Sequence, residues 1–201
     1  MTNKYKNRQL ESPPNCLEFI NKPSIDSRSG ITKLHITKRQ STVAIQDMES
    51  KLDYEYEWKK KDFNSFMTLT NGDQRICSVD SKLWASQYSV RSSSQCVGTL
   101  NHQTTRWKDR YFGKFMTLSK NRVDIYIKCE GKMTYIFLGD PLNKGKLIAQ
   151  CTKQSGIKQK NIKGIIESQY HMSISSNVDN EMMITLWLIT IENVTKSSFL
   201  C

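Results

Sequence analysis

The chain has 201 residues and a formal net charge of +11, which is enough length for one domain with its own hydrophobic core. No run approaches the roughly 18 apolar residues of a membrane span, and the first residues lack the apolar block of a secretory signal. We therefore expect a cytoplasmic protein that is not secreted, with its six cysteines present as reduced thiols.

The first 30 residues are predicted to form a flexible arm outside the folded domain. They contain Ser12–Asn15 and Ser27–Gly30, which are rich in Ser and Pro, and they show no sustained apolar period. Such a composition buries too little apolar surface to offset the entropy lost when a chain is ordered. A single β-rich domain is then expected over residues 31–201.

Alternation of apolar and polar residues dominates the part of the chain that follows. Tyr54, Tyr56 and Trp58 alternate with acidic residues, which is typical of a half-buried strand. Asn71-Gly72 separates two β-rich runs, and Glu130-Gly131 separates two more. Because such turns need residues that accept positive φ, both pairs predict tight hairpins.

The end of the chain also favours strands. Met182–Ile191 is apolar on both faces and rich in Ile and Thr, which indicates a central strand covered on both sides. With this segment we expect nine or ten strands and no helix. The predicted fold class is all-β, as an antiparallel sandwich or a jelly-roll-like barrel with a disordered N-terminal arm.

An internal similarity relates residues 58–70 to residues 107–119, at a constant offset of 49 residues. We interpret the two copies as strands of the same kind entering the same fold. On this interpretation their Trp and Phe side chains belong to the core, and they do not form a binding platform.

No catalytic motif is present in the chain. There is no glycine-rich phosphate loop, no nucleophile elbow and no His-Glu-x-x-His sequence. His35, His102 and His171 are each expected to serve packing or to lie on the surface, and no cysteine pair has zinc-ligand spacing. The sequence thus predicts a binding protein rather than an enzyme, without catalytic residues, metal or cofactor.

The positive charge is concentrated in one part of the chain. Between Arg106 and Lys163 there are 14 Lys or Arg and four acids, and no acid lies between Pro141 and Ile166. A lysine-rich soluble surface is one explanation, and an electrostatic footprint for phosphate is the other. We predict that single-stranded nucleic acid binds without sequence preference through Arg106, Lys108, Arg110, Lys144, Lys146, Lys153, Lys158, Lys160 and Lys163.

A family resemblance begins at Lys132. A hydrophobic strand there runs to Asp140 and Pro141, a basic loop and a second strand follow, and the apolar segment Met182–Ile191 lies near the end of the chain. This arrangement resembles the plant-virus movement protein superfamily of the tobamovirus and tombusvirus type. The resemblance implies a β-rich core, sequence-independent binding of single-stranded nucleic acid, a role in cell-to-cell movement and a signature function for Asp140.

Three other classes stay open. The outline of a basic arm and a small β domain also resembles viral coat and matrix proteins, which implies self-association on nucleic acid or on membranes. Trp107–Phe112 resembles an early strand of a pleckstrin-homology domain, which implies an adaptor that binds an anionic membrane surface. A cellular barrel of the OB type that binds nucleic acid is the remaining alternative.

Overall fold

The computed structural model describes residues 5–20, 30–39, 42–47, 53–61, 64–82, 86–92, 95–105, 108–154 and 167–197. Twelve antiparallel strands form one closed barrel in which strands adjacent in the chain pair with one another, and β1 closes the ring against β12. The strands are β1 (Ile31–Arg39), β2 (Thr42–Asp47), β3 (Asp53–Lys61), β4 (Asn64–Asn71), β5 (Gln74–Lys82), β6 (Gln87–Ser92), β7 (Gln95–Thr105), β8 (Lys108–Met116), β9 (Arg122–Glu130), β10 (Met133–Leu138), β11 (Lys146–Lys153) and β12 (Glu167–Ser175).

The expected all-β, antiparallel fold class is confirmed in its coarse form. The finer alternatives, a two-sheet sandwich or a jelly roll, differ from the observed connectivity, which is a simple up-and-down meander. Both predicted hairpins are present. Gly72 (φ 55°) lies in the turn between β4 and β5, and Gly131 (φ 61°) lies in the turn between β9 and β10. Glycine takes this left-handed conformation without steric cost.

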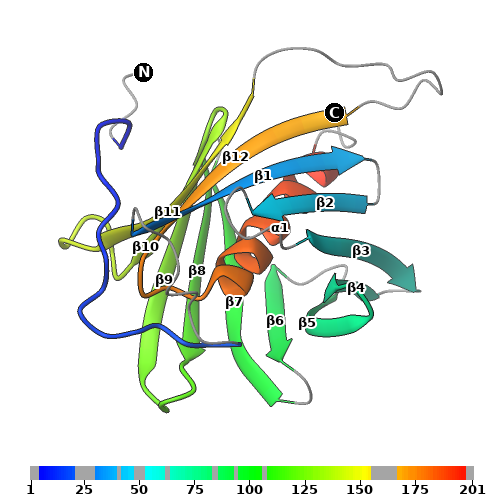
Figure 1. The fold of residues 1–201 in the computed structure, drawn as a ribbon, viewed down its shortest axis with the longest axis horizontal. Helices are drawn as coiled ribbons and strands as arrows, with labels where there is room; N and C mark the ends of the chain where they lie inside the picture. Colours follow the sequence, from blue (N-terminus) through cyan, green and yellow to red (C-terminus); the bar gives the residue numbers. More distant parts are fainter. Residues whose placement is uncertain are drawn as a thin grey trace.

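One helix, α1 (Asn180–Ser197), lies inside the barrel. Figure 1 shows it surrounded by the strands, and every residue from Met182 to Thr190 is buried. The prediction of a central strand over Met182–Ile191 is therefore wrong. An uninterrupted apolar run fits a strand covered on both faces and a helix buried all round equally well. The interior of a 12-stranded barrel is wider than facing side chains alone can fill, and here a helix fills it.

The start of α1 is fixed by Asp179. Its Oδ1 accepts the backbone N–H of Met182 at 3.0 Å, which satisfies one of the free donors of the first turn. At the same end of the barrel, Asn180 Nδ2 donates to Thr32 Oγ1 at 3.4 Å. Further along α1, the Trp187 ring packs against Tyr170 with a centroid distance of 5.0 Å. The helix therefore runs along the inside of the barrel, from the start of β1 toward the start of β12.

The prediction that residues 1–30 form an arm outside the core is wrong for residues 5–20. Leu17, Phe19 and Ile20 are buried in the main core, and Leu17 N–H donates to Asn177 O at 2.8 Å. These apolar residues have no regular period, because they cover the end of the barrel as an irregular segment. The pattern of the sequence therefore gave no indication of their burial.

A second hydrophobic cluster lies on the outer face of β9, β10 and β11, where Tyr5 packs against Tyr135, Phe137 and Leu147. Its ring lies 5.3 Å from that of Phe137. Arg8 donates to the carbonyl oxygens of Gly145 and Pro141, and Glu11 N–H donates to Leu147 O at 2.8 Å. The N-terminal segment thus seals an apolar patch on the outside of the barrel.

The two copies of the internal similarity occupy different kinds of position. In the first copy Trp58 lies in β3 and Phe66–Leu69 lie in β4, so the copy spans a hairpin. In the second copy Phe112 and Phe115 share the single strand β8, and Trp107 lies outside the described residues. The interpretation of both copies as equivalent strands is therefore wrong.

Candidate anion-binding rim

The meander places the ends of the strands in two separate rings. Every connection from an odd-numbered strand to the next even-numbered strand lies at one end of the barrel, and every connection from an even to an odd strand lies at the other. We define the basic rim as the last two residues of each odd strand, the first two of each even strand and the described turn residues between them. The opposite rim is defined in the same way for the other end.

The basic rim carries an uneven charge. Among its described positions there are eight cationic residues and three acidic ones. The acidic residues are Asp109, Glu130 and Glu167, and the cationic ones are Lys38, Arg39, Lys60, Lys61, Lys82, Lys108, Lys132 and Lys153. Asp109 is engaged with His102, whose Nε2 lies 3.1 Å from Asp109 Oδ1. The cationic positions are spread over five strands, β1, β3, β5, β8 and β11, and one turn, so they surround the barrel opening.

The opposite rim carries a smaller excess of positive charge. Its described positions hold six cationic residues, namely Arg75, Arg91, Lys120, Arg122, Lys144 and Lys146. Four acidic residues accompany them, namely Asp47, Asp53, Asp73 and Asp140. Glu18, Asp179 and Glu181 add negative charge at the same end, where α1 begins, and Arg8 adds a positive charge at the turn between β10 and β11. The basic rim therefore has the larger excess of positive charge of the two ends.

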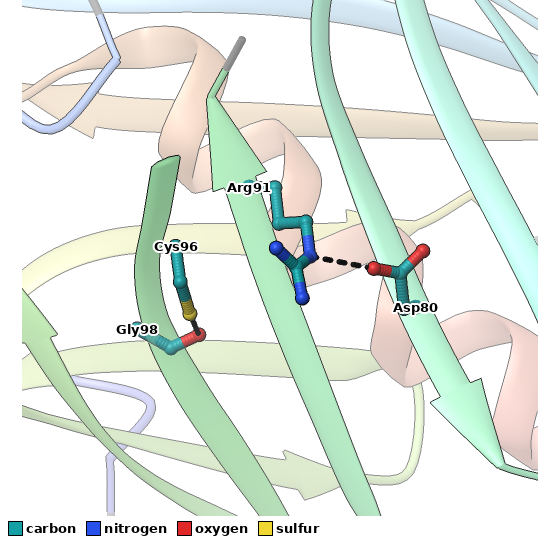
Figure 2. A network of polar contacts seen from close by, with 4 residues as sticks. All are labelled: Asp80, Arg91, Cys96 and Gly98. Atoms are coloured by element: carbon teal, nitrogen blue, oxygen red, sulfur yellow. Dashed lines mark hydrogen bonds and ion pairs between the residues drawn. The ribbon is translucent and has the colours of Figure 1, made fainter. Parts of the chain in front are cut away.

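One cation of the opposite rim is already paired. Figure 2 shows Arg91 of β6 beside Asp80 of β5, with Arg91 Nε at 2.7 Å from Asp80 Oδ2. Both side chains are partly exposed, so the pair contributes little stability, on the order of 0–1 kcal/mol. It does reduce the positive potential at this end. In the same view the thiol of Cys96 donates to Gly98 O at 3.6 Å.

The residues predicted to bind nucleic acid do not form one surface. Lys108 and Lys153 lie at the basic rim, whereas Lys144 and Lys146 lie at the opposite rim. Lys146 and Lys153 are the two ends of β11, and seven strand steps separate them by about 23 Å. These lysines are close in the sequence but lie at opposite ends of the barrel, because each strand crosses its whole height.

The other predicted residues have separate outcomes. Arg110, in β8, is half-buried, and its buried Nε has no hydrogen-bond partner. Arg106, Lys158, Lys160 and Lys163 lie outside the described residues. A lysine that was not predicted, Lys128, is buried on the outer face of β9, where its Nζ donates to Tyr5 Oη.

Sequence reasoning missed most of the basic rim. Lys38, Arg39, Lys60, Lys61, Lys82 and Lys132 were not among the predicted binding residues. Their positions in the sequence could have indicated the rim, because each of them lies at the end of a strand or in the turn that follows it. Comparing charges at alternate strand ends, instead of along the sequence, would have grouped them.

Asp140 stabilises the turn in which it lies, between β10 and β11. Its Oδ1 accepts the backbone N–H of Leu142 at 2.9 Å, and its Oδ2 accepts Asn143 Nδ2 at 2.9 Å. Its backbone oxygen accepts the N–H groups of Asn143 and Gly145. These contacts give Asp140 a structural role between β10 and β11. A signature role in binding stays a prediction of the resemblance.

The described cysteines inside the barrel are poor candidates for nucleophiles. Burial raises the pKa of Cys77 from 9.0 to about 12 and that of Cys129 from 9.0 to about 11. Burial also raises the pKa of Cys151. Since the thiolate is the reactive form, these three thiols are inert at neutral pH. Within the described part of the chain, no cluster of three or more His, Cys, Asp or Glu residues could hold a metal ion.

Comparison with models of known protein families and with curated proteins gives no match for this chain. The resemblance to viral movement proteins thus stays a prediction, and the apolar strand that completed it is the helix α1. No helix among the described residues has the length and apolar character needed to cross a bilayer.

Proposed function

We propose that this protein is a non-enzymatic binding module that docks on an anionic membrane surface through its basic rim. The observation that carries the proposal is the separation of charge between the two ends of the barrel. Eight cationic and three acidic residues lie at the basic rim, against six cationic and four acidic residues at the opposite rim. A surface charge that served solubility alone has no reason to collect at one end.

The arrangement of the cationic residues favours a flat partner. They are distributed around a ring of strand ends, from β1 through β11, and do not follow a single groove. A ring of this kind meets a planar anionic surface with many residues at once. A single nucleic-acid strand, by contrast, is held along one track. The central helix α1 fills the interior, so the partner is expected to contact the rim from outside.

Stacking of bases receives little support from the described side chains. Near the basic rim Tyr88 and Tyr170 are buried, and Tyr111 of β8 is also buried in the core. Phe66 is exposed on the outer face of β4 and offers one stacking surface. Because single-strand binders stack successive bases on exposed aromatic rings, we favour a lipid surface over nucleic acid.

The expected strength follows from the charge. Each Lys or Arg near an anionic leaflet contributes about 1 kcal/mol, and the attraction decays within a Debye length. An excess of several cationic residues therefore supports reversible binding without any inserted segment. The same reasoning predicts that binding weakens as the salt concentration rises.

The experiment is co-sedimentation of the protein with vesicles of phosphatidylcholine, with and without roughly 30 % phosphatidylserine. The test variant carries Lys132→Glu and Lys153→Glu at the basic rim. Its matched control carries Lys120→Glu and Lys144→Glu at the opposite rim, where both lysines are exposed. Both variants change the net charge equally. We expect the rim variant to lose roughly 30-fold or more in vesicle affinity, and the control to lose much less.

Two outcomes would contradict the proposal. Equal losses in the two variants would show that net charge acts without a preferred end of the barrel. Absence of vesicle binding, together with binding of a short unstructured oligonucleotide, would favour the nucleic-acid function. In that case the slope of log K against log salt should be about −0.7 per phosphate contact.

A further inference from the structure

Two histidines lie side by side on the outer wall of the barrel, away from the basic rim. His35 of β1 and His171 of β12 are direct partners in the antiparallel register. Their ring centroids are 5.1 Å apart, with an interplanar angle of 63°. Both side chains are half-buried, so they remain accessible from solvent. The pair lies on the seam of the barrel, where the first strand meets the last.

The separation of the rings suits a shared metal ion. A metal at 2.0–2.1 Å from each coordinating nitrogen lies about 3.2 Å from each ring centroid. Two imidazoles in adjacent coordination positions, at an angle between 90° and 109°, then have centroids roughly 4.5–5.2 Å apart. The observed 5.1 Å falls inside this interval. For both rings to bind one ion, each must rotate about its side-chain bonds until one of its nitrogens points to a common position.

The surroundings indicate which kind of ion would bind. On the other side of each histidine, the next strand places a neutral polar residue opposite it. His171 pairs with Thr152 of β11, and His35 pairs with Gln46 of β2. No cluster of three or more His, Cys, Asp or Glu occurs in the described residues, so the pair would supply both strong protein ligands. Water would complete the coordination. Imidazole nitrogens favour copper, nickel and zinc over magnesium and calcium, which prefer oxygen ligands.

We infer that His35 and His171 form a binding site for a single late first-row transition-metal ion, of the Ni²⁺ or Cu²⁺ class, that links β1 to β12. The linked strands are neighbours in the barrel although they are the first and the last strand of the chain. A metal bound to both histidines therefore holds the seam closed. It binds the folded state in preference to the unfolded chain, where the two histidines are far apart in sequence.

The test uses the untagged full-length chain, stripped of metal with a chelator and then titrated with NiCl₂ by calorimetry. The exposed thiols Cys16 and Cys96 are first replaced by Ser, because thiolates also bind nickel. His35→Gln and His171→Gln are compared with His102→Gln, which changes a histidine that faces Asp109 inside the barrel. We expect one Ni²⁺ per chain, a melting temperature that rises with nickel, and a loss of about tenfold or more in affinity in each seam variant. His102→Gln should bind nickel as the parent does.

A second measurement needs no substitution at the seam. Bound Ni²⁺ should broaden the imidazole resonances of His35 and His171, and removal of the metal with a chelator should restore them. Lys33, two residues from His35 on the same face of β1, adds a positive charge that weakens binding without abolishing it. Nickel binding that survives both seam variants, or no nickel binding in the parent, would overturn the inference.

Discussion

Asp179 Oδ2 accepts the backbone N–H of Ile20 at 2.6 Å, although the two residues lie 159 positions apart. The same oxygen accepts Phe19 N–H at 3.0 Å, while Oδ1 caps α1 at Met182. One buried carboxylate thus starts the central helix and holds the N-terminal segment over the end of the barrel. The burial of Leu17, Phe19 and Ile20 depends on an acid that the sequence pattern does not connect with them.

Replacement of Asp179 by Ala should destabilise the whole protein. The change removes the cap of α1 and leaves the backbone N–H groups of Phe19 and Ile20 without their acceptor. A lost cap costs about 1 kcal/mol, and each buried donor left unsatisfied costs about 1–3 kcal/mol. We expect a fall of about 3 kcal/mol or more in the free energy of unfolding, measured in urea. Asp73→Ala, in the exposed turn after β4, is the control and should change it by less than about 0.5 kcal/mol.

Replacement of Tyr5 by Ala tests whether the N-terminal segment is part of the fold. Tyr5 is buried against Tyr135 and Phe137, and its hydroxyl accepts a hydrogen bond from Lys128 Nζ. Removing a buried aromatic ring costs about 3–5 kcal/mol, and Lys128 would lose its partner as well. We expect a comparable loss in the free energy of unfolding. Gln9→Ala, at an exposed position of the same segment, should be neutral. A neutral effect of Tyr5→Ala would support the flexible arm predicted from composition.

The sequence predicted the local hairpins well and the interior poorly, for a physical reason. Gly72 and Gly131 fix turns through their own backbone preference, which acts within a few residues. The state of Met182–Ile191 depends on what surrounds it, because an apolar run is stable in any conformation that removes it from water. Its helical form follows from the width of the barrel, which no local pattern contains.

The candidate site was predictable only in part. The excess of positive charge led us to predict an anionic partner, and of the residues predicted to bind it Lys108 and Lys153 lie at the basic rim. Lys144 and Lys146 were grouped with them because they are near in sequence. Strand direction separates them, so proximity in the chain becomes distance across the barrel.

Replacement of Trp187 by Ala tests the role of α1 as the centre of the core. Trp187 is fully buried and packs edge-on against Tyr170. The cavity left by a Trp to Ala change costs about 3–5 kcal/mol, and the barrel cannot collapse around a rigid helix to fill it. We expect a loss of this size in urea unfolding with a largely unchanged circular dichroism spectrum in water. Ile191→Ala, at a half-buried position nearer the end of α1, should cost clearly less.

The stability of the protein should fall as the pH rises above about 9, because its buried thiols are held in the neutral form. The pKa of Cys77 is raised from 9.0 to about 12 and that of Cys129 from 9.0 to about 11. In the unfolded chain these thiols lose their protons near pH 9, whereas the folded state retains them. Above that pH the unfolded state binds fewer protons, so the free energy of unfolding decreases by up to about 1.4 kcal/mol per pH unit for each thiol. Below about pH 9 their contribution is fully present and constant.

The measurement is urea unfolding at intervals between about pH 8 and pH 10.5, for the parent and for Cys77→Ala. The variant has one buried thiol fewer, so its stability should fall less steeply above pH 9, by roughly 1 kcal/mol per pH unit. Tyrosines and lysines that titrate in the same range affect both proteins equally.

Reaction with a thiol reagent at neutral pH is an independent check, because Cys16 and Cys96 are exposed and should react in the folded protein. Cys77 and Cys151 are buried and should react only after unfolding, since reagent and solvent reach them only when the barrel opens. Equal pH slopes in parent and variant, or rapid labelling of Cys77 in the folded state, would contradict a closed interior around α1.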